Sequence, residues 1–460
     1  MGNVLFWFRN DLRLHDNEAL IKAAETGAVI PVFVLDKKSF KKTSLGFKRT
    51  GAFRTQFLLD SLSDLKTSLR SIGSDLIIKI GDPETEVIKL AKAYEVTHIF
   101  TSKEVTQEET NLEYEISQQL KPLNIEMGLV WGATLYHVLD LPFQVKFLPD
   151  IFTEFKNKLE QHSRVRPIFP TVTSLNSPKG FSGSEVPTLS KLGFGEEKIE
   201  TVYKGGESAG LARVKEYIWQ KELVKTYKET RNGLLGKDYS SKFSPWISLG
   251  CISPRFVFEE IQKFEEKVIK NDSTYWLIYE LMWRDYFHFV SLKYGIRLFK
   301  RSGIKHVMNL KWRNSKPDFQ KWCDGNTGVP FVDANMRELK ETGFMSNRGR
   351  QIVASFLTKD LKIEWWWGAM YFESKLLDYD VCSNWGNWNY VAGIGNDPRV
   401  NRYFNILKQA ANYDPDGEYV RNWIPELSTL PVAELNTPWL SEQATVLKYP
   451  KPILDVTAWK

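Results

Sequence analysis

The chain has 460 residues, of which 42% are hydrophobic, and this composition excludes a disordered or fibrous protein. Its formal net charge of +6 excludes a histone-like polycation, although a basic face could still meet phosphates. The length suits two or more domains of about 150 residues each. Most of the 16 tryptophans lie from residue 219 onward, so the second half of the chain has an unusual content of large aromatic rings.

The three cysteines, Cys251, Cys323 and Cys382, lie far apart and without CxxC spacing. This spacing argues against a zinc site, an iron–sulfur cluster and a disulfide scaffold. We therefore expect no metal and a reducing, cytoplasmic setting. The first eight residues are too short for the apolar part of a signal peptide and read as a strand. No apolar run is long enough to span a bilayer, so we expect no membrane association.

Strands and helices alternate in the first part of the chain. We expect strands at 4–8, 29–35, 76–80, 98–101 and 126–131, and helices at 16–24, 53–69, 84–94 and 108–121, the first of them capped near Asp16. Such alternation predicts a Rossmann-like parallel sheet with right-handed crossovers, and hence an α/β domain. No GxGxxG motif follows the first strand, so the ordinary dinucleotide fingerprint is absent.

Proline and glycine then interrupt the pattern from residue 132 to residue 206, which indicates a long interdomain linker. After Gly210 the strand signal disappears, and a helical period of 3.6 residues continues to about Asn422. We therefore expect an α/β domain at 1–131, a linker at 132–206, an all-α domain at 207–430 and a C-terminal tail at 431–460.

The segment LLDYDVCSNWGNWNY at 376–390 crowds acids, asparagines and large aromatic rings into one stretch. Buried carboxylates and amides need donors or cations, and flat rings so close together suit a packed core or a stacked ligand such as a flavin or a nucleobase. Two interpretations remain open here: a site for a large polar aromatic ligand, or a core segment with a helix cap.

Two helices carry charged residues at helical spacing. In the helix expected over 272–295, Glu280, Trp283 and Arg284 share one face, and their apolar neighbours indicate that the helix is buried. In the helix expected from Asn347, Arg350 is a natural partner for an acid of the 376–390 segment. A surface Glu–Arg pair and a structural ion pair are the alternatives.

The loop YSSKFSPW at 239–246 gathers hydroxyls ahead of a helical region. Hydroxyls and backbone amides at such a position can bind an anion, although the Walker pattern GxxxxGK[ST] is missing. Capping of the helix is the alternative.

Taken together, four motifs resemble the photolyase/cryptochrome flavoproteins, and within them the cryptochrome-DASH branch. The motifs are FRNDLRLHDN at 8–17, ELMWRD at 280–285, MSNRGRQ at 345–351 and DYDVCSNWGNWNY at 378–390. They are long, occur in the family's order and cover essentially the whole chain. The resemblance implies that the expected helical domain is a FAD-binding domain.

The resemblance also implies which residues hold FAD. The pyrophosphate would lie at Ser240, Ser241, Phe243 and Ser244 with Tyr227 beside it, and the isoalloxazine would be surrounded by Asn347, Arg350, Asp378, Asp380 and Asn384. Asn384 corresponds to the residue that faces flavin N5. An Arg350–Asp378 pair beside the ring would favour its negative, reduced form.

Three tryptophans, Trp388, Trp365 and Trp312, match the family's electron relay, through which light-excited oxidised flavin is reduced from the surface. For the neighbouring Trp366, Trp367 and Trp385, core packing is the alternative interpretation. Glu104 matches the acid that commonly holds a 5,10-methenyltetrahydrofolate antenna, although a solvated glutamate at a strand end is an equal alternative.

By the same resemblance, the activity is repair of cyclobutane pyrimidine dimers in DNA by an excited reduced flavin. Glu280 would hydrogen-bond the dimer and Trp283 would stack on it, with Asn347 and Arg348 nearby. The chain departs from the main photolyase pattern at two positions, where Gln351 replaces a methionine and Tyr390 replaces a tryptophan. Weaker stacking predicts a preference for single-stranded DNA, as in the DASH branch. We expect a monomer.

Two rival functions remain. A blue-light receptor without repair activity would be marked by a long regulatory C-terminal extension, whereas we expect only the tail 431–460 after the helical domain. A (6-4) photolyase would carry paired catalytic histidines near the flavin, and His288 and His306 do not fall at those motif positions.

Overall fold

The computed structural model describes residues 2–196, 199–399, 402–456 and 459. By its internal contacts the chain divides into two compact units. The first unit comprises Met1–Lys228, Ser241–Ile296 and Leu377–Ser383, and the second comprises Glu229–Ser240, Arg297–Leu376 and Asn384–Lys460. Each unit therefore combines segments that lie far apart in the sequence. The sequence boundaries at residues 131, 206 and 430 remain a proposal.

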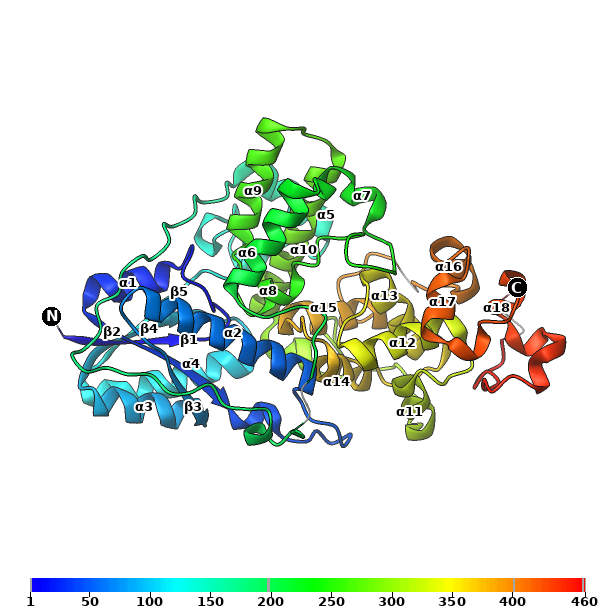
Figure 1. Cartoon of the computed structure of the whole chain (residues 1–460), viewed down its shortest axis with the longest axis horizontal. Helices are drawn as coiled ribbons and strands as arrows, with labels where there is room; N and C mark the ends of the chain where they lie inside the picture. Colours follow the sequence, from blue (N-terminus) through cyan, green and yellow to red (C-terminus); the bar gives the residue numbers. More distant parts are fainter. Residues whose placement is uncertain (1, 197–198, 400–401, 457–458, 460) are drawn as a thin grey trace. The chain divides into compact units, whose positions relative to one another are not determined.

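A five-stranded parallel sheet in the order β3-β2-β1-β4-β5 lies in the described part of the first unit (Figure 1). Its strands are β1 Asn3–Phe8, β2 Ala28–Asp36, β3 Ile77–Gly81, β4 Val96–Ser102 and β5 Glu126–Val130. The crossover helices are α1 Glu18–Thr26, α2 Ala52–Ser71, α3 Pro83–Ala93 and α4 Gln107–Leu120. In Figure 1, α1 and α2 lie on one face of the sheet and α3 and α4 on the other. The predicted Rossmann-like fold is confirmed.

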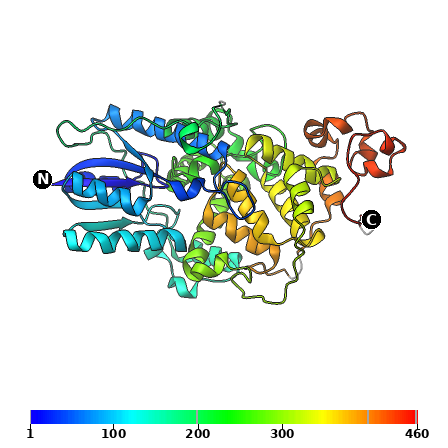
Figure 2. The same cartoon turned by 90° about the horizontal axis from the view of Figure 1, so that it is seen from below.

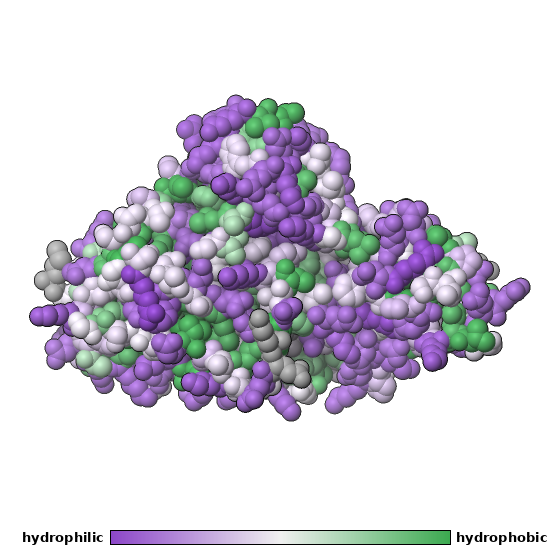
Figure 3. Space-filling view, in the orientation of Figure 1, coloured by the Kyte–Doolittle hydropathy of each residue, from purple (hydrophilic) through white to green (hydrophobic). Residues whose placement is uncertain are grey.

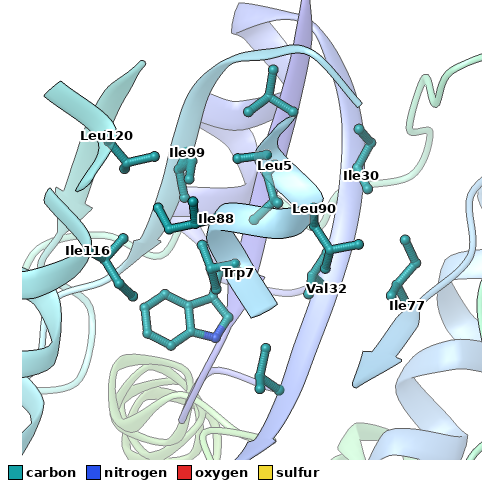
Figure 4. Close-up of a cluster of buried hydrophobic side chains, with 14 residues drawn as sticks. Leu5, Trp7, Ile30, Val32, Ile77, Ile88, Leu90, Ile99, Ile116 and Leu120 are labelled. Carbon is teal, nitrogen blue, oxygen red and sulfur yellow. The ribbon is translucent and has the colours of Figure 1, made fainter. Parts of the chain in front are cut away.

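Apolar strands buried on both faces explain why this sheet is parallel. On one face, side chains of β1, β2 and β3 pack against α3 and α4 (Figure 4). Pro31 in β2 cannot donate a ladder hydrogen bond. It pairs with Phe6 of β1, whereas pairing with β3 begins only at Val32, so the missing N–H falls outside the β2–β3 ladder.

The segment 132–206 contains a helix that the sequence analysis does not predict, α5 Phe152–His162. Its buried residues Phe152, Phe155 and Leu159 follow helical spacing. The prolines and glycines on either side obscure this short pattern. The segment is thus more than an irregular connection.

The remaining helices of the first unit follow the predicted helical pattern. They are α6 Glu207–Lys215, α7 Tyr227–Thr230, α8 Ser244–Ser248, α9 Pro254–Lys267 and α10 Asp272–Tyr294, with the end of α7 belonging to the second unit. Asp285 of α10 accepts backbone hydrogen bonds from Leu135 (2.9 Å) and Tyr136 (2.8 Å). Burial raises the pKa of Asp285 to about 7. These bonds anchor α10 to the chain segment that leaves the sheet.

Asp16 has a different role from the one that its position suggests. We predicted a helix capped near Asp16, but α1 begins at Glu18 and Asn17 accepts the capping hydrogen bond from Leu20 N. Asp16, with a φ of 46°, instead accepts hydrogen bonds from the buried Arg255 of α9. The short side chain of Asp tolerates this left-handed conformation.

The second unit is built of helices (Figure 2). They are α11 Lys316–Asp324, α12 Pro330–Thr342, α13 Asn347–Ser355, α14 Trp365–Lys375, α15 Val381–Ala392, α16 Ile406–Tyr413, α17 Glu418–Trp423 and α18 Val432–Leu435, and the first turn of α15 belongs to the first unit. The predicted helix from Asn347 is therefore confirmed.

Helices in the described part of the chain are all too short or too polar to cross a membrane. The face drawn in Figure 3 is mainly hydrophilic, with small scattered hydrophobic patches.

Candidate functional site

The hydroxyl loop at 241–244 is held by side chains of the first unit. Arg213 Nε donates to Ser241 O at 3.1 Å, and the Phe243 ring packs edge-on against Tyr217 with centroids 5.7 Å apart. Ser244 Oγ donates to Asp378 Oδ2 at 2.7 Å. The structure thus brings together two elements that the sequence analysis assigned to one ligand, the loop and an acid of the 376–390 segment.

Asp380 lies in a charged cluster with two residues of α10. Arg284 Nη2 is 3.5 Å and His288 Nε2 is 3.7 Å from Asp380 Oδ2. Burial lowers the pKa of His288 to about 4, so the imidazole is neutral at neutral pH. Burial by itself raises the pKa of Asp380, but His288, Arg284 and hydrogen bonds from Ser383 together make the net shift downward, so this carboxyl is ionised at neutral pH.

His288, Asp380 and Cys382 place one possible metal-ligand atom each within 4.8 Å of one another. This grouping was not predicted, because His288 lies about 90 residues before Asp380 and Cys382 in the chain. Arg284 already supplies a positive charge to Asp380, and burial holds the pKa of the Cys382 thiol well above its ordinary value. We therefore interpret the cluster as a buried polar network and not as a cation site.

Glu280 and Trp283 lie half-buried on α10. One face of the Trp283 indole stacks on Phe152 of α5, with ring centroids 3.7 Å apart and an angle of 9° between the rings. Arg284, one residue on, donates to Ala133 O. The unpredicted helix α5 therefore supports the tryptophan that we expect to stack on the substrate.

In the second unit, Gln351 lies between two arginines. Its Oε1 accepts from Arg348 Nη1 at 3.3 Å and from Arg402 Nη2 at 3.5 Å. The Arg402 guanidinium also lies 5.6 Å from the centroid of the Tyr390 ring. The two positions that depart from the main photolyase pattern, Gln351 and Tyr390, thus share one arginine.

Arg348 is held by two further contacts of the second unit. Its Nη2 donates to Asn232 Oδ1 at 3.2 Å, and its guanidinium lies 4.4 Å from the Tyr413 ring centroid. Asn347, at the start of α13, is exposed. An exposed amide and a fixed guanidinium on one helix end are suited to contact a polar ligand.

The expected flavin residues of the second unit are Ser240, Asn347, Arg350 and Asn384. Arg350 Nε donates to Met345 O at 2.9 Å. Asn384 is buried and its Nδ2 donates to Ala369 O at 3.1 Å, which fixes the amide plane. Asp378 belongs to the first unit, and its pairing with Arg350 stays a prediction.

The expected relay tryptophans occupy different depths of the second unit. Trp365 and Trp388 are buried, and Trp312 is half-buried. In the described residues, ring contacts join Trp388 to Trp322 (6.4 Å) and Trp365 to Trp385 (5.8 Å) instead of joining Trp388 directly to Trp365.

Glu104 is buried at the end of β4 and accepts a hydrogen bond from Asn10 Nδ2 at 3.0 Å. Burial raises the pKa of Glu104 to about 7, against the lowering effect of Arg9. The alternative of a solvated glutamate at the strand end is wrong, because the side chain is desolvated. At neutral pH this carboxyl can both donate and accept hydrogen bonds.

The chain matches known proteins along almost its whole length. Two family models match, one described as "DNA photolyase" over residues 4–174 and one as "FAD binding domain of DNA photolyase" over residues 276–460. A cryptochrome DASH of Gloeobacter violaceus is 49% identical, over 98% of this chain and 93% of the relative. The chain belongs to the photolyase/cryptochrome family, in its DASH branch.

Solved structures agree with this assignment. A cryptochrome of Synechocystis matches with a TM-score of 0.96 and 47% identity, covering 100% of this chain and 98% of the other. A class III photolyase of Agrobacterium tumefaciens matches with a TM-score of 0.87 and 29% identity, covering 100% and 95%. The resemblance stated from the motifs is therefore confirmed.

The FAD-binding domain of this DASH protein presents groups that fit FAD. The buried Nε atoms of Arg284 and Arg348 have no hydrogen-bond partner among the described residues. Buried donors of this kind need an acceptor, and a flavin with a pyrophosphate supplies acceptors. Within the second unit, the fixed amide of Asn384 can hydrogen-bond a polar ring edge. The predicted FAD cofactor is supported by the family match, whereas the individual contacts remain proposals.

Two residues that contact the predicted site were missed by sequence reasoning. Phe152 lies in the interrupted linker, where no functional residue was sought, and Arg402 lies beyond the last motif. A signal for Arg402 existed, since Arg399 and Arg402 form a basic pair shortly after Tyr390. No local pattern indicates that Phe152 packs against Trp283.

Proposed function

We propose that this DASH-family protein is a FAD-dependent, blue-light-driven lyase that splits cyclobutane pyrimidine dimers, preferentially in single-stranded or looped DNA. The observation that supports this most is the polar group of Gln351, Arg402 and Tyr390. It combines a weakly stacking ring with a guanidinium suited to a phosphate. The chain retains Glu280 and Trp283, which are the residues expected to hold a dimer.

Bound FAD, when reduced and excited by light, supplies the electron that opens the dimer and takes it back afterwards. The chain's own residues bind and orient the substrate. Glu280 offers a hydrogen-bonding carboxyl group to the base edge, and Trp283, supported by Phe152, offers an indole face. Arg348 and Arg402 offer positive charge to the DNA backbone, which contributes affinity without sequence information.

The decisive experiment measures dimer splitting directly. FAD-loaded protein, reduced beforehand with dithionite, is illuminated with a dimer-containing oligonucleotide, and the restored thymines are quantified by chromatography. We expect light-dependent repair and release of FAD on denaturation. Protein that contains FAD but restores no thymine in single-stranded substrate would favour the rival function, a blue-light receptor.

Glu280→Gln should leave FAD bound and lower the repair rate. The substitution keeps the side-chain shape but removes the acidic proton that can shift toward the negative charge developing on the dimer. Loss of a hydrogen bond to a charged group, about 1.5–3 kcal/mol, corresponds to roughly 10–100-fold in rate. Single-turnover repair assays check this, with the exposed Glu266→Gln as the control. Full activity of Glu280→Gln excludes Glu280 from the mechanism.

We also propose that Trp388, Trp365 and Trp312 carry electrons to the flavin during photoreduction. Trp388→Phe should slow blue-light bleaching of the 450 nm-region flavin band by about tenfold or more, equivalent to about 1.4 kcal/mol in barrier height. The physical reason is removal of the redox-active indole expected nearest the flavin. Trp423→Phe, in the same unit but outside the relay, serves as the control. An unchanged bleaching rate in Trp388→Phe would mean that these three rings pack in the core and do not carry electrons.

For the antenna, we propose that Glu104 binds methenyltetrahydrofolate. Its burial and its pKa of about 7 support this, because a half-protonated carboxyl can meet both donors and acceptors of a pterin ring. Glu104→Ala should weaken folate binding by roughly 10–100-fold through loss of about 1.5–3 kcal/mol. Near-UV absorbance of the purified protein measures folate occupancy, and FAD content is the internal control. Equal folate occupancy in wild type and Glu104→Ala contradicts the assignment.

We further propose that the protein acts as a monomer in the cytoplasm. Sedimentation of FAD-loaded protein with and without a dimer-containing oligonucleotide tests the oligomeric state.

A further inference from the structure

The second unit contains a pocket of about 740 Å³ between the segment 299–314 and the start of α14. Seven of its lining residues are aromatic or cationic, namely Phe299, Trp312, Trp366, Trp367, Lys300, Arg301 and Arg313. Sites for small molecules occupy about 300–1,000 Å³, so the pocket is large enough for a compound of nucleotide size. None of the functions proposed above uses this pocket as a binding site.

The aromatic walls of the pocket are fixed from behind. Trp366 Nε1 donates to Phe299 O at 2.9 Å, and its ring meets Trp385 edge-on with centroids 5.9 Å apart. Trp367 is buried and meets Phe319 edge-on at 5.3 Å. Rings with fixed positions can stack a planar ligand at little entropic cost.

The charge of the pocket favours an anion. Lys300, Arg301 and Arg313 contribute positive charge, whereas Glu364 is the one acidic residue of the lining. Arg301 Nε lies 2.7 Å from Glu364 Oε1, and Arg313 Nη2 lies 2.8 Å from Asp318 Oδ2. Both guanidiniums remain more than half exposed to solvent, and Lys300 has no ion-pair partner among the described residues.

The position of Trp312 connects the pocket with electron transfer. Trp312 is the half-buried member of the proposed relay and forms part of the pocket wall. The Trp366 ring contacts the Trp385 ring, which in turn contacts the ring of the buried Trp365. Trp385 follows Asn384, the residue expected at the flavin. A molecule in the pocket therefore lies against Trp312 and also against Trp366, the outer member of the ring contacts Trp366–Trp385–Trp365.

We propose that this pocket binds a planar, anionic one-electron donor that restores Trp312 after photoreduction. This inference rests on the proposed relay. One electron passes from the donor to the oxidised indole of Trp312, which returns to its neutral closed-shell form, while the donor becomes its one-electron-oxidised radical. No bond forms or breaks, and no proton needs to move. Reduced flavin mononucleotide and ascorbate share the required chemistry.

Flash photolysis of the FAD-loaded protein tests the proposal. A flash produces the tryptophan radical, and the rate of its decay is followed at increasing concentrations of each donor without oxygen. A donor that binds in the pocket gives a decay rate that saturates, whereas random collision gives a linear dependence. If the decay rate saturates with only one of the two donors, ascorbate or reduced flavin mononucleotide, that donor is the one that the pocket binds.

Lys300→Glu is the test variant, because this substitution reverses the charge at an exposed position without breaking an ion pair. The half-saturating donor concentration should rise about tenfold or more through loss of one charge-assisted contact. The control is Lys311→Glu, an exposed neighbour that does not line the pocket. High salt should imitate Lys300→Glu in the wild type.

Linear dependence for both donors, or equal saturation in wild type and Lys300→Glu, overturns the proposal. Failure of the underlying function has a different signature. If the relay itself is wrong, the flash produces no tryptophan radical, and if repair is wrong, dithionite-reduced protein restores no thymine in light.

Discussion

Dimers in single-stranded or looped DNA should be repaired roughly 10–100-fold faster than dimers in fully paired DNA, measured at one salt concentration. Flipping a dimer out of a duplex costs a few kcal/mol, while stacking on an aromatic side chain returns about 1–3 kcal/mol per base. A tyrosine at position 390 contributes less stacking free energy than a tryptophan, because its ring is smaller. In paired DNA the dimer therefore stays stacked within the duplex. In an unpaired strand no base pairs have to be broken, so the free-energy cost of flipping is absent.

The contacts of Gln351 sharpen this expectation. Its carbonyl oxygen accepts hydrogen bonds from Arg348 and Arg402, which methionine could not accept as strongly. The double variant Gln351→Met with Tyr390→Trp should narrow the gap between paired and unpaired DNA. It enlarges the stacking surface and releases two guanidiniums toward phosphates. Single-turnover repair of matched paired and unpaired substrates, at several salt concentrations, measures the gap.

Tyr390→Phe is the matched control, since it keeps the ring and removes only the hydroxyl. Its strand preference should equal that of the wild type. Equal repair of paired and unpaired DNA by the wild type would falsify the stacking argument, even if dimer splitting itself is observed.

Asp16→Asn should destabilise the first unit by about 3–5 kcal/mol, the typical cost of removing one partner of a buried ion pair. Asp16 is fully buried and accepts from Arg255 Nε (3.0 Å) and Nη2 (2.6 Å). It also accepts from Phe169 N at 2.9 Å and from Ser253 Oγ. Asparagine keeps the shape and tolerates the positive φ, so the loss reports the charge left alone on Arg255.

Urea unfolding of the FAD-loaded protein, followed by circular dichroism, measures this loss. Glu18→Gln is the control, because Glu18 forms an i,i+4 ion pair with the exposed Lys22 on α1, and surface pairs contribute about 0–1 kcal/mol. An unfolding midpoint of Asp16→Asn equal to that of Glu18→Gln contradicts the importance of the buried pair.

Sequence patterns alone were sufficient for the order of strands and helices up to residue 131 and for the family, although they did not reveal helix α5. Apolar strands alternating with helices up to residue 131 sufficed for the parallel sheet, because strand and helix periods are local properties of the chain. The four motifs sufficed for the DASH branch and its FAD-binding domain. Both the periods and the motifs are formed by residues that are close in the sequence, so the sequence alone reveals them.

The contacts between side chains could be known only from the folded chain. Asp16 proved to be the partner of Arg255 and not a helix cap, and Phe152 proved to support Trp283. Gln351 proved to share Arg402 with Tyr390, and burial, not sequence position, raised the pKa of Glu104 to about 7. The physical reason is that ion pairing, ring stacking and desolvation depend on distance in space, which the local periodicity of a sequence does not contain.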